Sequence, residues 1–195
     1  MNGQFDYVMA LVSIILGLGL THILSALGSA VHRLRGHGKP IRLEATYLLW
    51  VVFVTVWMVS FWWWEFKFKD LGTQWTYGLF LFVILYAVLL FLLAVVLVPK
   101  DMDGLDDSFE YFMAGRRWFF GGFAFVNVVD LLDTVLKGTD WALQPGYLAQ
   151  VLAYMIGALV GIRAEKRSIQ LGVAIAMVAV QMSYTWDALN ILGGW

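Results

Sequence analysis

FDYVMALVSIILGLGLTHILSALGSAVHRL, residues 5–34, is a mainly apolar stretch that is long enough to cross a bilayer, which takes about 20 residues of α-helix. It is too long for a signal peptide and no basic segment precedes it, so we interpret it as a retained membrane-spanning helix. Five further apolar stretches follow, separated by Gly, Pro and charged residues. The six predicted spans are approximately residues 5–34, 43–64, 75–98, 118–136, 147–162 and 169–189.

Composition supports the same class of protein. The 195 residues are 61% hydrophobic and only 14% charged, whereas soluble domains carry about 25% charged residues. The sequence therefore predicts an all-α, polytopic integral membrane protein with a single transmembrane domain that has the lipid bilayer as its main partner. The absence of Cys excludes disulfides and thiolate metal sites, and no long basic block indicates nucleic-acid binding.

The distribution of positive charge predicts the orientation. The connections after the first, third and fifth spans, with the residues that border them, carry ten of the thirteen Lys and Arg residues. By the positive-inside rule these connections are cytoplasmic and both termini lie outside, in the inner membrane of a bacterium. In the third connection, Phe109, Phe112 and Met113 lie at helical spacing, which predicts a short cytoplasmic helix on the membrane surface between spans three and four.

The first span contains a ladder of small residues at every fourth position. Small side chains let two helix backbones approach closely, and their hydroxyl groups can form hydrogen bonds across the contact. Two interpretations are open: the ladder packs inside the bundle, or it joins copies of the chain in an oligomer. The ladder consists of Ser13, Gly17, Thr21, Ser25 and Ser29.

His22 lies inside the same apolar span. At about 1.5 Å per residue it is well below the outer surface, and an ionisable group at that depth is a functional-site hypothesis. It could relay protons or hydrate an inner vestibule. The alternative is a neutral imidazole bonded to the backbone of a neighbouring helix or to Glu44.

The fourth span carries the strongest candidate, Asp130, on one helical face with Asn127 and Thr134. Polar residues at a comparable depth in the sixth span could complete an acidic, outward-opening cavity that holds a cation or a proton. Alternatively, these residues only join the two helices, and the outermost acids are solvated. The other members of this candidate site are Asp133, Gln181, Tyr184, Thr185 and Asp187.

No catalytic, metal-binding or cofactor motif is present, so the sequence predicts neither an enzyme nor a resident cofactor. The leading hypothesis is a small channel or transporter for protons or monovalent cations that acts as a homo-oligomer. The alternative is a non-catalytic accessory or scaffold subunit of a larger complex with other membrane proteins.

Overall fold

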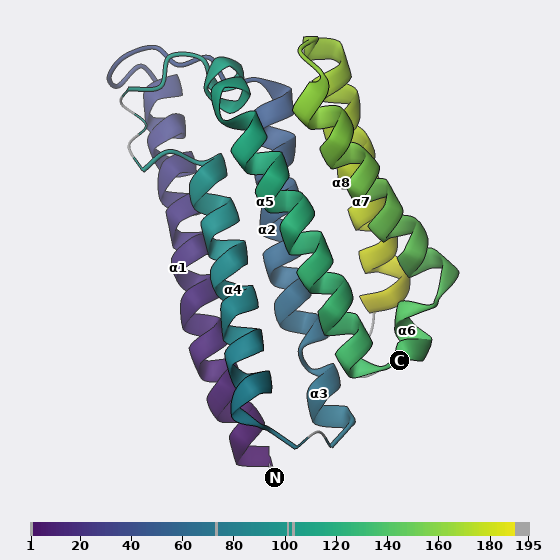
Figure 1. Ribbon diagram of the computed structural model, residues 1–195. Helices are drawn as coiled ribbons and strands as arrows, with labels where there is room; N and C mark the ends of the chain where they lie inside the picture. The colour runs from purple at the N-terminus through teal and green to yellow at the C-terminus, as the bar shows by residue number, and fades with distance from the viewer. Residues whose placement is uncertain (1, 73, 101, 103, 190–195) are drawn as a thin grey trace.

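The computed structural model describes residues 2–72, 74–100, 102 and 104–189 (Figure 1). Six helices in this part of the chain are long and apolar enough to cross a membrane, and no strand occurs in it, which confirms an all-helical protein of the multi-pass membrane type. The long helices are α1 (Asn2–Leu34), α2 (Ala45–Trp64), α4 (Tyr77–Leu97), α5 (Ser108–Lys137), α7 (Pro145–Arg163) and α8 (Arg167–Leu189). The short ones are α3 (Lys67–Asp70) and α6 (Thr139–Ala142).

Five of the long helices form a ring in which α2, α4, α5, α7 and α8 each contact two neighbours. Helix α1 lies outside this ring, against α4 and α2, at the edge of the bundle (Figure 1). Successive long helices run in opposite directions, so connections 35–44, 98–107 and 164–166 share one end, which we call the basic end. The opposite end carries α3 and α6 (Figure 1).

Helix ends follow local chemistry. The Thr76 hydroxyl caps α4 by accepting the N–H of Leu79 at 3.2 Å. The Asp107 carboxylate caps α5 by accepting the N–H of Phe109 at 2.8 Å. Gly138, at φ 152°, ends α5 in a conformation that favours glycine.

One predicted element is absent. We expected residues 109–113 to lie in a separate surface helix, but they form the first turns of α5, which continues unbroken from Ser108 to Lys137. The apolar spacing of Phe109 and Phe112 is used for packing, because both rings are buried against the bundle. The same apolar spacing occurs in a separate surface helix and in the first turns of a spanning helix. The spacing alone therefore could not show where the spanning helix begins.

Aromatic side chains fill the centre of the ring, on the basic side of Trp57. The Trp50 indole packs against Phe119 at 5.0 Å and Phe120 at 5.2 Å between ring centroids, and Phe53 packs against Phe123 at 5.4 Å. These five rings are at most 1% exposed. Edge-to-face packing of this kind gives a dense, dry core.

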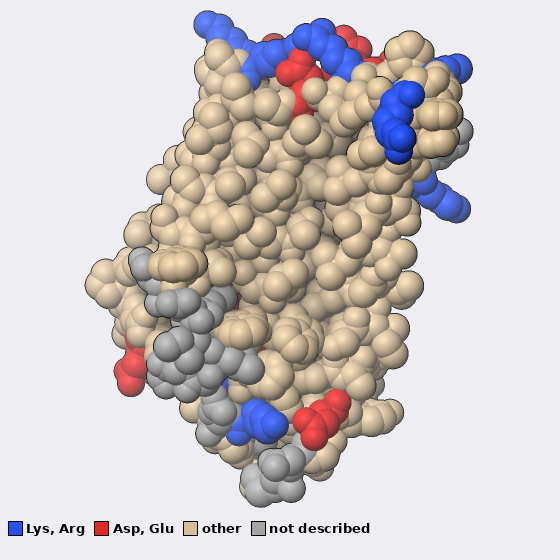
Figure 2. Space-filling view, turned by 180° about the vertical axis from the view of Figure 1, so that it is seen from behind, with Lys and Arg blue, Asp and Glu red and all other residues tan. Residues whose placement is uncertain are grey.

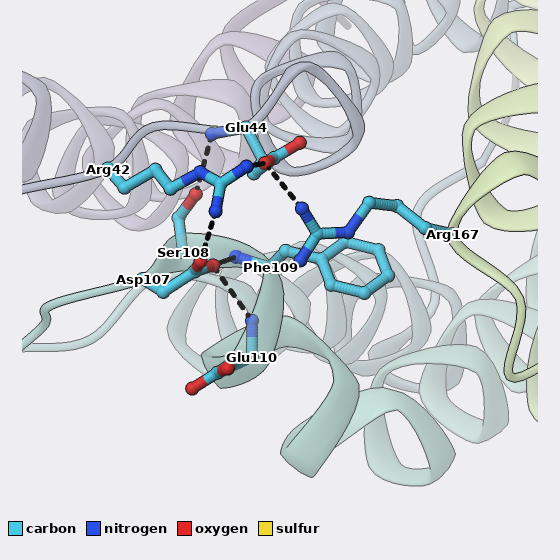
Figure 3. Close-up of polar contacts among 7 residues, drawn as sticks. All are labelled: Arg42, Glu44, Asp107, Ser108, Phe109, Glu110 and Arg167. Atoms are coloured by element: carbon cyan, nitrogen blue, oxygen red, sulfur yellow. Dashed lines mark hydrogen bonds and ion pairs between the residues drawn. The ribbon is translucent and has the colours of Figure 1, made fainter.

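The basic end is closed by charged side chains, which gather there above a broad band that lacks charge on the face seen in Figure 2. Glu44 accepts hydrogen bonds from Arg167 at 2.7 Å and is paired with Arg42 at 2.9 Å (Figure 3). The Arg42 guanidinium lies 3.8 Å from Asp107, and the Arg167 guanidinium lies 4.4 Å from the centre of the Phe109 ring. These contacts join the starts of α2, α5 and α8.

Glycine at position 161 provides a test of the packing. A Cβ atom there would lie 2.2 Å from the buried Phe120 ring, whereas one at Gly121 would contact nothing within 4 Å. We expect Gly161→Ala to lower the free energy of unfolding by about 1–3 kcal/mol, since overpacking forces neighbouring rings to shift. Gly121→Ala is the matched control. Equal thermal unfolding temperatures of the two variants in detergent would contradict this packing.

Candidate functional site

A polar cluster lies inside the ring, toward the end that carries α3 and α6. Its centre is α5, where positions 130, 133 and 137 share one helical face because they are three and seven residues apart. Asp130 accepts hydrogen bonds from the hydroxyl of Tyr86 on α4 at 2.6 Å and from that of Tyr147 on α7 at 2.9 Å. One carboxylate therefore joins three helices.

One turn further along α5 lies a buried group of charges, the Lys137 triad. The Lys137 ammonium lies 2.7 Å from Glu65 at the end of α2, and it also binds Asp133. All three side chains are completely buried. The Phe68 ring covers the ammonium, 4.4 Å from its centre. One oxygen of each acid, Glu65 Oε2 and Asp133 Oδ1, has no hydrogen-bond partner in the described structure.

A chain of uncharged polar groups joins α7, α8 and α2 beside Asp130. The Tyr154 hydroxyl donates to Gln181 Oε1 and accepts from the Gln150 amide at 3.0 Å. Gln181 then donates to Ser60 at 3.3 Å and to Thr185 at 3.1 Å. Because the donors and acceptors alternate, the orientation of each amide is fixed. Gln150 Oε1 is left buried and without a partner.

Two spaces adjoin these groups. An internal cavity of about 30 Å³ has room for a water molecule or an ion of similar size. A groove of about 500 Å³ runs between α7 and α8 on the outside of the cavity. Tyr147, Gln150 and Tyr184 line both spaces and so separate them. The remaining cavity residues are Trp57, Ser60, Phe61, Trp64, Asp130, Thr134 and Gln181.

The structure brings most of the predicted acidic site together. Asp130, Thr134, Gln181 and Tyr184 line the cavity, and Thr185 adjoins it through Gln181. Asn127 lies one turn away and joins α5 to α7 by donating to the carbonyl of Val151 at 3.1 Å.

The two outermost acids have different outcomes. The alternative in which Asp133 is solvated is wrong: α3 covers the end of the cluster, and Lys137 supplies the charge that lets the carboxylate stay buried. Asp187 belongs to α8, but its side chain lies outside the described part of the chain.

His22 belongs to a different part of the molecule. Its Nε2 lies 2.9 Å from the carbonyl of Val98, at the basic end of α4, and since a carbonyl only accepts, Nε2 carries the proton. The contact is the backbone hydrogen bond that we considered as the alternative. His22 is on α1, outside the ring, so it does not meet Asp130 in one chain.

The small-residue ladder of α1 does not pack inside the bundle. Ser13, Thr21, Ser25 and Ser29 are exposed, and a Cβ at Gly17 would have no neighbour within 4 Å. Ser13 alone meets another long helix, by accepting a hydrogen bond from the Trp62 indole at 2.9 Å.

Sequence reasoning missed Glu65, Lys137, Tyr86, Tyr147 and Gln150. Lys137 directly follows the fourth predicted span and Tyr147 begins the fifth, so neither was expected inside the bundle. The four-residue spacing of Asp133 and Lys137, which is that of a helical ion pair, was the available signal. Glu65 and Tyr86 carried no such signal because their partners are distant in sequence.

No family model, curated protein or solved structure matches this chain. Within the described ranges, no group of three or more His, Asp or Glu is arranged to hold a metal ion. The chemistry of the site itself, with its buried carboxylates, its lysine and its hydroxyl groups, is therefore the basis for inferring function.

The Lys137 triad yields a stability prediction. Lys137→Met leaves the Glu65 and Asp133 carboxylates buried without a cation, so we expect a loss of about 3–5 kcal/mol in the free energy of unfolding. Lys100→Met, at an exposed position, is the matched control. Adding Glu65→Gln and Asp133→Asn to Lys137→Met should recover part of the loss in thermal unfolding. If Lys137→Met unfolds at the wild-type temperature, the ion pairs do not hold this end of the bundle together.

Proposed function

We propose that this protein is a membrane carrier for protons or monovalent cations, with Asp130 and the Lys137 triad as its ion-binding site. The observation that carries the proposal is the placement of the acids: Glu65 and Asp133 share the buried Lys137 ammonium, and Asp130, one turn away, is held by the hydroxyls of two tyrosines. A buried charge without a counter-charge is costly in free energy. A proton or cation bound at Asp130 would remove this cost for its carboxylate.

The arrangement of space favours a carrier over an open channel. The cavity and groove lie in the half of the bundle that carries α3 and α6, while the packed rings of Trp50, Phe119 and Phe120 occupy the route toward the basic end. A carrier opens to one side at a time. The ion pairs of Glu44 with Arg167 and of Arg42 with Asp107, which join the starts of α2, α5 and α8 at the basic end, fit a state closed on that side (Figure 3).

The proposed orientation follows from the positive-inside rule. The basic end collects most of the Lys and Arg residues, so we assign it to the cytoplasm of a bacterium and assign both termini and the acidic site to the outside. The site would then take up its ion from the outer compartment. No catalytic role is included in this proposal.

The second candidate is a subunit that assembles through α1, either with copies of itself or with other membrane proteins. It is favoured by the exposed ladder, because small residues and hydroxyl groups facing outward from a membrane helix are typical of helix–helix contacts. This role is compatible with transport by a homo-oligomer.

An ion-flux assay tests the carrier. With purified protein in liposomes, we expect a membrane potential to drive proton or cation uptake, and Asp130→Asn to reduce the rate by roughly tenfold or more because the variant removes a buried charge from the site. His22→Ala should retain most of the flux, since His22 bonds only to a backbone carbonyl. Equal flux in wild type, Asp130→Asn and empty liposomes would refute the proposal.

Native mass spectrometry after gentle extraction tests assembly. We expect Gly17→Leu to shift the protein from oligomer to monomer, because the larger side chain blocks close approach on the ladder, where an added Cβ has no neighbour within 4 Å in one chain. Gly121→Leu on α5, where an added Cβ likewise has no neighbour within 4 Å, is the matched control. An unchanged mass distribution in Gly17→Leu would exclude the ladder as the contact.

A further inference from the structure

The groove between α7 and α8 has features that the binding of a small inorganic ion does not require. At about 500 Å³ it is far larger than a proton or monovalent cation needs. Small apolar side chains, including Ala149, Ala179 and Val180, form much of its wall. Spaces of this size and lining are typical of sites for small organic molecules.

The inner wall of the groove is polar and aromatic. Gln150 is 7% exposed, and its carbonyl oxygen has no hydrogen-bond partner within the described structure. Its NH₂ group donates to Tyr154, so the oxygen is the part of this amide that can accept a further donor. A buried acceptor without a partner is costly, and a ligand that donates to it removes the cost.

The charges behind the groove determine whether the ligand that donates to Gln150 is a cation or an anion. Directly behind this wall, Tyr147 donates to Asp130, and the Lys137 triad adds two further carboxylates to a single ammonium. The Tyr147 and Tyr184 rings, whose centroids are 6.0 Å apart, present aromatic surface to the groove. Aromatic faces and a carboxylate directly behind the wall both favour a cation over an anion.

We propose that the groove binds a small organic cation, with its ammonium group at Gln150 and Tyr147 and its apolar body between α7 and α8. This inference rests on the proposed function and deepens it by naming a substrate class for the same site. Binding needs no covalent step: the ammonium brings positive charge toward Asp130, and its N–H groups supply the missing donor to Gln150.

Calorimetry with the full-length protein in detergent provides the test. The probe is 2-phenylethylamine, which is cationic near neutral pH, and 2-phenylethanol is its neutral counterpart. We expect the amine to bind at least about tenfold more tightly than the alcohol. Equal affinities, or no binding of the amine, would overturn the proposal and would mean that the groove accepts any apolar molecule or none of this class.

Two variants locate the site. Gln150→Leu should weaken amine binding by about tenfold or more, while Gln74→Leu, in an exposed connection, should leave it unchanged. Ala179→Trp should abolish binding by filling the groove; position 179 is exposed, so the fold does not depend on it. Wild-type affinity in Ala179→Trp would refute this location.

Amine binding without ion flux would refute the carrier alone, whereas flux without amine binding would refute only this inference.

Discussion

The Lys137 ammonium is the constraint on which this end of the molecule depends. Without a cation, Glu65 and Asp133 could not remain completely buried, because desolvated carboxylates of like charge repel each other. With it, the end of α2 is fixed to the end of α5, and α3 can close over the pair through Phe68. Asp130 then lies one turn away, within reach of hydroxyl groups from α4 and α7.

The bundle is built differently in its two halves. Toward the basic end, aromatic rings pack against each other and leave polar chemistry to the Arg42, Glu44 and Arg167 network at the surface. Toward the other end, tyrosine and glutamine side chains replace those rings, and the packing leaves a cavity. Dense apolar packing excludes water and ions, whereas a cavity with hydrogen-bonding groups admits them. This asymmetry is the physical basis of the carrier proposal.

Part of the site was accessible from sequence because helical periodicity places residues on a common face. Depth alone grouped Asp130 and Thr134 on one span with Gln181 and Tyr184 on another, and these four residues line one cavity. The four-residue spacing also placed the small residues in one stripe along α1. It could not show whether that stripe packs inside the bundle or faces outward. Since α1 lies outside the ring, its ladder faces outward, apart from the contact of Ser13 with Trp62.

The sequence by itself determined that six helices are long and apolar enough to cross a membrane, because the length of an apolar run and the spacing of breakers are local properties. Only the tertiary structure decided which polar groups meet. Glu65 and Lys137 are 72 residues apart, and Tyr86 and Asp130 are 44 apart, so their contacts depend on how the helices pack and rotate. That choice comes from the combined burial of many apolar side chains, together with the need to pair every buried charge, and no single segment encodes it.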